Sequence, residues 1–148
     1  LVTVPELTEI RNASGFEVSS DGVLNFENLV LVADTSVNIL EPKKDGTFTL
    51  DLDVTNLTVR SNGLAEFNLR GSADNLNLRF FNEAPRLNGR NLIVQTANVD
   101  HRGANDAIFD VRQSIEGIIR GVGNVICPIE PPSVDVETLS KGRLIFEN

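Results

Sequence analysis

The chain has 148 residues, of which 41% are hydrophobic and 23% are charged, a composition typical of a folded domain rather than a disordered segment. The formal net charge of -8 argues against nucleic acid as a partner, because binding to phosphates requires clustered cations. The sequence has no stretch of about 18 apolar residues that would indicate a membrane-spanning helix, and the single cysteine, Cys127, allows no intrachain disulfide.

The first residues already have the pattern of a strand in progress. Residue 1 is leucine rather than methionine, and residues 1–5 carry alternating apolar side chains. We expect residue 1 to be a processing or cleavage boundary, so that a native N-terminal segment and any leader have been removed. Residues 1–148 are then predicted to form one domain that lacks this segment.

Hydrophobic and polar residues alternate in many short runs along the chain, which is the pattern of half-buried strands. The clearest runs are residues 48–54, 64–69 and 134–136. Turn-forming residues separate them, as at residues 45–46 and 61–63. Residues 109–119 are long enough for a helix, but they contain strand-like pieces, and we predict strand and turn there.

An Asn-Leu-x-(Val/Leu) signature recurs four times, beginning at Asn28, Asn56, Asn75 and Asn91. A fixed strand motif at the irregular offsets of 28, 19 and 16 residues is typical of a solenoid, in which each coil keeps its strand and varies its turns. A β-propeller would need about 40 residues for each blade. The sequence therefore predicts an all-β fold, a single-stranded right-handed parallel β-helix of about six to seven coils.

Stacking of these four strands predicts columns of equivalent side chains about 4.8 Å apart. The second and fourth positions of the motif are expected to point inward: Leu29 and Leu31, Leu57 and Val59, Leu76 and Leu78, and Leu92 and Val94. The asparagine that begins each motif is expected to bond to the asparagine of the next coil, as in side-chain ladders.

The fifth position predicts an outward column of Val32, Arg60, Arg79 and Gln95. Arginines one coil apart repel each other unless an opposite charge lies close to them. Three acidic residues could supply that charge from neighbouring strands: Glu66, Asp74 and Glu83. The alternative is a bound anion or acidic glycan, which makes Arg60, Arg79 and Gln95 the binding residues that the sequence suggests.

The remaining reactive side chains do not form a catalytic or metal-binding pattern. His101 is the only histidine, and the turn-like composition of residues 100–103 predicts a solvated corner for it. Cys127 lies in an apolar run and is expected to be a buried core thiol. Because a zinc site requires three or four ligands, we predict neither a metal nor a cofactor.

Asp51 and Asp53 lie on the same face of one strand and form the only visible carboxylate pair. The β-helix fold includes many polysaccharide lyases and hydrolases, which require a calcium cluster with a base or two opposed carboxylates. A pair on an outer face is usually only solvated, and the chain has no long loops to form a cleft. We therefore predict no catalytic residues.

The order of several short motifs from Val2 to Asn148 resembles the head GIN domain family, described as auto-transporter adhesins and common in Bacteroidetes. The residues that carry the resemblance are Val2-Thr3-Val4-Pro5-Glu6-Leu7, Asn12-Ala13-Ser14-Gly15, Gly121-Val122-Gly123-Asn124-Val125-Ile126, Ser133-Val134 and Gly142-Arg143-Leu144-Ile145. The chain departs from the family where it has Ser61-Asn62-Gly63, and Thr96-Ala97-Asn98 without glycine, in place of repeated Ser-Gly.

This resemblance implies a parallel β-helix that is exported to the periplasm, outer membrane or surface of a Gram-negative bacterium. The leading hypothesis is a non-enzymatic adhesin or binding domain whose partner is a surface glycan or protein. One alternative is a carbohydrate-active enzyme of the β-helix type. Another is a self-assembling structural solenoid, in which copies of the chain associate through sheet ends or faces.

Overall fold

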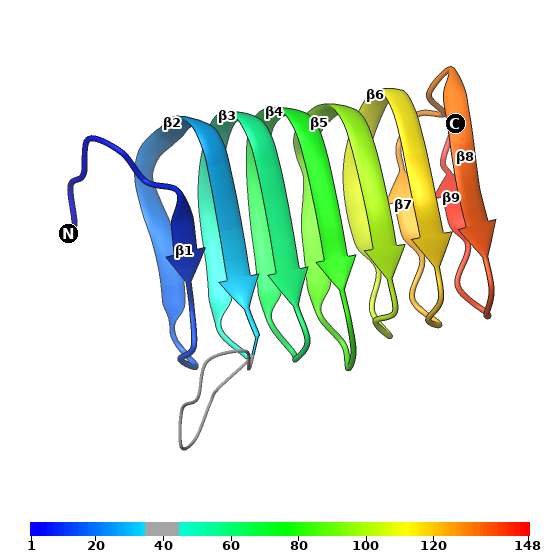
Figure 1. Ribbon diagram of the computed structural model, residues 1–148, viewed down its shortest axis with the longest axis horizontal. Coiled ribbons are helices and arrows are strands. Elements are labelled where there is room, and N and C mark those ends of the chain that lie inside the picture. Colours follow the sequence, from blue (N-terminus) through cyan, green and yellow to red (C-terminus); the bar gives the residue numbers. More distant parts are fainter. Residues whose placement is uncertain (35–44) are drawn as a thin grey trace.

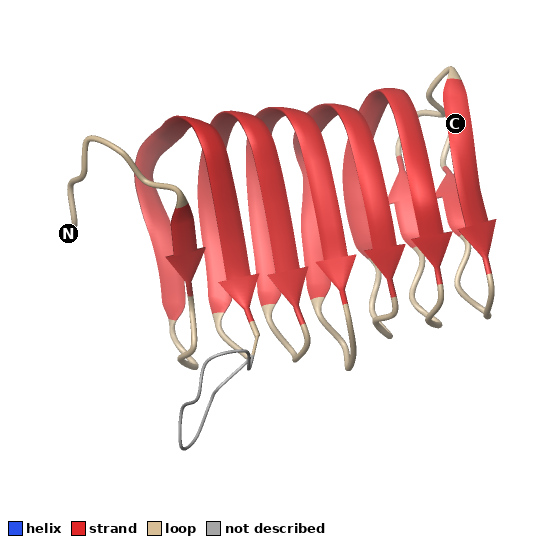
Figure 2. Ribbon diagram, viewed as in Figure 1, coloured by secondary structure: helices blue, strands red, loops and turns tan. Residues whose placement is uncertain are grey.

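The computed structural model describes residues 1–34 and 45–148, and all of their regular structure is β-strand (Figure 2). The strands are β1 (Glu9–Arg11), β2 (Glu17–Ala33), β3 (Thr47–Ser61), β4 (Glu66–Phe80), β5 (Arg86–His101), β6 (Ala107–Ile119), β7 (Val125–Cys127), β8 (Ser133–Thr138) and β9 (Leu144–Phe146). Strand β6 confirms the prediction that residues 109–119 form strand rather than helix.

The strands form one parallel sheet that coils around a common axis. Its order is β1-β2-β3-β4-β5-β6-β7-β9, with β8 paired to β6 beside β7. From the N- to the C-terminus the chain rises at the back, crosses at the top and descends at the front while it advances along the axis, which is a right-handed coil (Figure 1). The predicted right-handed parallel β-helix is confirmed, with about seven coils.

Each long strand bends midway and so contributes to two opposite faces of the flattened coil (Figure 1). We call the part before the bend the first limb and the part after it the second limb; in β3 these are residues 47–53 and 56–61. Near the bend of β4, Gly71 has a φ of 106°, and a Cβ there would lie 2.0 Å from the Leu52 carbonyl oxygen. Only glycine fits such a position.

The core lies between the two faces and consists of stacked apolar columns. One column joins Leu29, Leu57, Leu76, Ala97 and Ile115 from successive second limbs. Phe48 and Phe67 stack with ring centroids 4.8 Å apart on the first limbs. All eight inward positions predicted from the Asn-Leu motif are at most 1% exposed, which confirms the predicted alternation.

The fourth Asn-Leu motif does not stack on the third, and this part of the prediction is wrong. Leu92 and Val94 lie opposite Gly71 and Ala73 of β4, so Asn91 does not continue the asparagine column. Thr96 takes that place opposite Asn75. The cause is the offset between the two strands. On the first limb Asn68 already pairs with Asn88, 20 residues on, and the bulge in β5 adds one more residue before Asn75 meets Thr96.

His101 is fully buried, which corrects the prediction of a solvated corner. Strand β5 continues through residue 101, and the inward alternation places the ring against Phe80, with centroids 5.5 Å apart. The Gly103 N–H donates to Nδ1 at 3.2 Å, so Nε2 carries the proton and donates to the Asn105 carbonyl oxygen at 2.9 Å. Burial lowers the pKa of His101 and favours the neutral ring.

Cys127 is buried in the core, as predicted. Burial raises the pKa of the Cys127 thiol to about 12, so that it stays protonated at neutral pH. In the pairing of β7 with β9, the last strand, Cys127 lies opposite Phe146. Its role is therefore packing between the last coils.

Replacing Phe67 with alanine should lower the free energy of unfolding by about 3–5 kcal/mol, because it removes a fully buried ring from the middle of the aromatic stack. Urea unfolding followed by circular dichroism measures the change. The matched control is Phe16→Ala, where the ring is 81% exposed and the expected loss is about 0.5 kcal/mol. Equal losses in the two variants would contradict the assigned core.

The single histidine allows a direct test of its burial by NMR titration of the folded protein. We expect the pKa of His101 to lie below 6.5, its ordinary value. The unfolded chain then binds the proton first as the pH falls, so stability is lost below about pH 6.5 until the folded-state pKa is reached. Comparing unfolding at pH 7.5 and 5.5 in wild type and His101→Asn should show a smaller pH dependence in the variant. A pKa at or above 6.5 would show that the ring is solvated.

Candidate functional site

A ladder of amide and hydroxyl side chains runs along the outside of the second limbs. Its members are Asn28, Asn56, Asn75, Thr96 and Ser114, which occupy equivalent positions on successive coils. Asn56 Nδ2 donates to Asn28 Oδ1 at 2.9 Å, and Asn75 Nδ2 donates to Asn56 Oδ1 at 2.8 Å. The predicted asparagine ladder is thus confirmed for three coils, and Thr96 extends it by donating to Asn75 Oδ1 at 2.7 Å.

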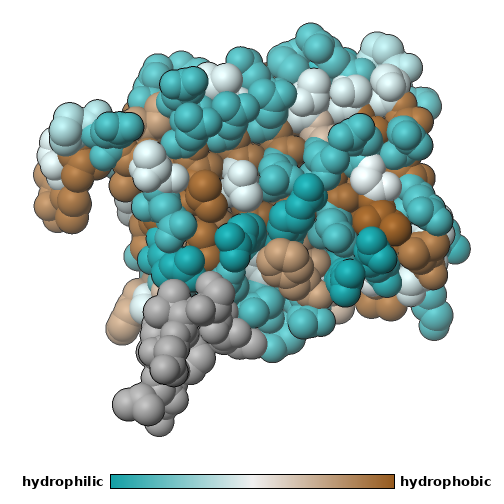
Figure 3. All heavy atoms as spheres, in the orientation of Figure 1, coloured by the Kyte–Doolittle hydropathy of each residue, from teal (hydrophilic) through white to brown (hydrophobic). Residues whose placement is uncertain are grey.

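A second polar column lies two residues further along each limb. It contains Thr58, Asn77, Asn98 and Glu116. Asn98 Nδ2 donates to Glu116 Oε1 at 2.7 Å, so the last two members of this column are linked between coils. In Figure 3, which views this face, hydrophilic residues cover much of the surface and hydrophobic ones appear between them.

The two columns border a groove of about 500 Å³, which we call the ladder groove. Its polar lining consists of Asn56, Thr58, Asn75, Asn77, Thr96, Asn98, Ser114 and Glu116. Apart from Glu116 these side chains are uncharged, and each can donate and accept hydrogen bonds. The groove can therefore contact a polar ligand through repeated groups one coil apart.

The predicted arginine column lies beside the ladder groove and is confirmed in part. Arg60 lies opposite Arg79 on neighbouring coils, as expected. Asp100, and not Gln95, follows Arg79 in this column. Gln95 lies one residue before the ladder residue Thr96, and its Oε1 accepts a hydrogen bond from Gln113 at 3.3 Å. The three proposed binding residues therefore do not form one column.

The two arginines are held by neighbours other than the expected acidic residues. Asp34, with a side chain only 3% exposed, accepts from Arg60 Nη2 and from Arg11 Nη1, each at 2.9 Å. Arg79 Nη2 donates to Asn98 Oδ1 at 2.7 Å, which ties the arginine to the ladder groove. The repulsion between Arg60 and Arg79 is thus relieved within the chain. Glu66, one of the expected partners, accepts instead from Asn88 at 3.0 Å.

The carboxylate pair considered for catalysis is engaged in bonds between coils. Asp51 accepts from Nε and Nη2 of Arg70, and this pairing lowers the pKa of Asp51. Asp53 accepts from Asn25 at 3.0 Å and from Ser72 at 3.2 Å. A glycosidase requires a carboxylic acid whose pKa is raised. The pairing with Arg70 instead lowers the pKa of Asp51, which does not suit a general acid.

No group of three histidine, cysteine, aspartate or glutamate side chains that could hold a metal ion occurs within residues 1–34 and 45–148. In the same part of the chain there is no helix that could cross a membrane. The geometry of the site is that of a polar contact surface on a rigid sheet.

Comparison with known proteins identifies the family. The model of the family described as "Putative auto-transporter adhesin, head GIN domain" matches residues 1–131. A crystal structure of a protein from Bacteroides fragilis NCTC 9343, described as a putative adhesin, superimposes with a TM-score of 0.71 at 19% sequence identity. The match covers 87% of this chain and 55% of that chain, and at this identity it shows a common fold. No curated protein matches the chain. The resemblance that the motifs suggest is confirmed, and the chain belongs to the head GIN domain family.

Proposed function

We propose that this chain is a non-enzymatic binding domain that is exported from a Gram-negative bacterium and takes part in attachment at the cell surface. The description of its family as auto-transporter adhesins supports export and a role in attachment. The observation that carries the proposal is the ladder groove, where a hydrogen-bonded ladder and a second polar column border a groove of about 500 Å³.

The ladder groove suits binding because its side chains are already ordered. Hydrogen bonds from Asn56 to Asn28, from Asn75 to Asn56 and from Thr96 to Asn75 fix the ladder before any ligand arrives. A ligand then meets side chains that lose little further entropy on binding. Because the pattern repeats with each coil, it fits a surface glycan or an extended protein segment better than a small compact molecule.

The residues considered for catalysis favour a binding role over an enzymatic one. Asp51 is paired with Arg70, His101 is enclosed with both ring nitrogens hydrogen-bonded, and Cys127 is buried with a raised pKa. A nucleophile or general acid needs access to substrate and a pKa suited to proton transfer. These three side chains have structural partners instead.

Blocking the ladder groove should weaken binding without unfolding the protein. We predict that wild-type protein binds members of a panel of immobilised surface glycans and cell-surface proteins, with NMR shifts at Asn56, Asn75 and Thr96. Thr58→Arg should weaken each interaction that causes these shifts by more than about tenfold, because it blocks the groove. Thr55→Arg is the matched control, since Thr55 is exposed near the bend and outside the groove. Surface plasmon resonance measures the binding.

Two results would overturn this proposal. One is equal binding by the Thr58→Arg and Thr55→Arg proteins. The other is cleavage of a glycan by wild-type protein that is lost in Asp51→Asn, since this would establish an enzyme. Incubation with each glycan and measurement of new reducing ends tests the second possibility, and the proposal predicts no release.

A further inference from the structure

The first limbs carry a second groove, on the face opposite the ladder groove, where the bulge of β5 interrupts the pairing. Strand β5 pairs with β4 as far as Asn88 and resumes at Leu92, and it pairs with β6 as far as Gly89 and resumes at Ile93. Arg90 and Asn91 therefore leave the regular ladder. Bulges occur often beside functional sites, because they redirect side chains and open the sheet locally.

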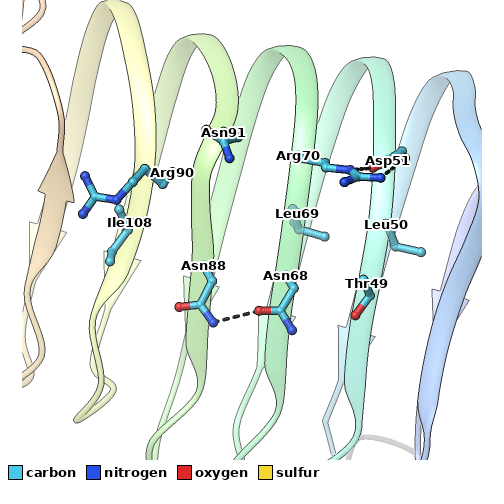
Figure 4. Close-up of a pocket in the computed structure, with 10 residues that line it drawn as sticks. All are labelled: Thr49, Leu50, Asp51, Asn68, Leu69, Arg70, Asn88, Arg90, Asn91 and Ile108. Atoms are coloured by element: carbon cyan, nitrogen blue, oxygen red, sulfur yellow. Dashed lines mark hydrogen bonds and ion pairs between the residues drawn. The ribbon is translucent and has the colours of Figure 1, made fainter.

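This bulge groove measures about 460 Å³, within the range of small-molecule binding sites. Figure 4 shows its polar residues in two rows. Thr49, Asn68 and Asn88 form one row, and Asp51, Arg70, Asn91 and Arg90 form the other. Leu50, Leu69 and Ile108 lie between the rows. Leu50 and Leu69 are only 2% and 3% exposed and belong to the core, so the groove offers a ligand mainly its two polar rows. Such rows match the hydroxyl groups on the rim of a sugar ring.

The polar side chains are held in place and still have hydrogen-bonding capacity. Asn88 Nδ2 donates to Asn68 Oδ1 at 2.8 Å, and Arg90 Nη2 donates to Glu147 at 3.0 Å. In the described part of the chain, Nδ2 of Asn68, Nη1 of Arg70 and Nε of Arg90 have no bonding partner. Oδ1 of Asn88 and the Asp51 carboxylate supply acceptors beside these donors. Neighbouring hydroxyl groups, which both donate and accept, require such a mixture.

The charges around the bulge groove favour a neutral ligand over an acidic one. Arg70 is paired with Asp51 and Arg90 with Glu147, so the guanidinium charges at the groove are matched by carboxylates. The whole chain carries a net charge of -8, which repels a polyanion. The same reasoning applies to Arg60, which Asp34 already pairs on the other face. The side chains thus offer hydrogen bonds without a surplus of positive charge.

We propose that the bulge groove is a binding site for a neutral oligosaccharide, with its ring hydroxyls bonded by Arg70, Asn91 and the Asn68–Asn88 pair. This goes beyond the proposed function, because it requires neither export nor the ladder groove. The lining contains no aromatic ring, so stacking adds nothing to the affinity of a single site.

The test titrates isotope-labelled protein with neutral hexasaccharides, namely cellohexaose, maltohexaose and mannohexaose, and with acidic hexagalacturonate. We expect at least one neutral oligomer to shift the NMR signals of the Asn68, Asn88 and Asn91 side-chain amides and the Arg70 Nε. The acidic oligomer should bind more weakly. Arg70→Gln and Asn91→Ala should each raise the Kd of that neutral oligomer by about tenfold.

Matched controls keep the result specific to the groove. Arg120→Gln removes an arginine that is also ion-paired, to Asp100, but does not line the groove. Asn82→Ala changes an exposed asparagine outside it. Both should bind like wild type. Because Arg70→Gln also breaks the pairing with Asp51, Asn91→Ala provides a variant at an exposed position that should keep its fold.

Three results would overturn the inference: no shift with any neutral oligomer, stronger binding of hexagalacturonate, or equal weakening by the control variants. Absence of oligosaccharide binding at the bulge groove can be distinguished from absence of binding at the ladder groove. Thr58→Arg acts on the opposite face and should leave oligosaccharide binding at the bulge groove unchanged, whereas shifts confined to Asn56, Asn75 and Thr96 would place the sugar in the ladder groove instead.

Discussion

The parallel register between successive coils is the constraint on which the rest of this structure depends. Backbone hydrogen bonds hold neighbouring coils about 4.8 Å apart, so each side chain lies beside the residue at the same position of the next coil. Like residues therefore come together: Phe48 stacks on Phe67, and Asn56 bonds to both Asn28 and Asn75. Repetition favours apolar and amide columns but penalises charged ones, and Arg60 beside Arg79 is tolerated because Asp34 and Asn98 hold the two guanidinium groups.

The bulge of β5 is where this constraint is relaxed, and it has two consequences. It shifts the register of the second limb by one residue, so that Thr96 rather than Gln95 lies opposite Asn75 and continues the ladder. It also removes Arg90 and Asn91 from the regular pairing on the opposite face, where they border the bulge groove with Arg70. One local irregularity thus sets which residue continues the ladder on one face and changes the side chains exposed on the other.

Much of this fold could be predicted, because alternation and repetition are local properties of the sequence. The Asn-Leu motif identified the inward leucines and the amide ladder, and both follow from period-two geometry. The position of the fourth motif could not be predicted, because its spacing of 16 residues is shorter than the coil at that point. Strands β4 and β5 pair at offsets of 20 and 21 residues, so Gln95 was placed beside Arg79 where Asp100 lies. The burial of His101 and the pairing of Asp34 with Arg60 depend on contacts between coils. A turn-like composition around His101 gave no sign that β5 extends to that residue.

The measurement that tests this register most directly is a set of cross-strand nuclear Overhauser effects between β4 and β5 in labelled protein. In-register parallel strands bring backbone protons of paired residues close together. The account predicts contacts between the segments around Asn75 and Thr96, and between those around Ala73 and Val94. Contacts from Asn75 to Asn91 would contradict it, because they would restore an unbroken repeat and remove both the continuous ladder and the bulge groove.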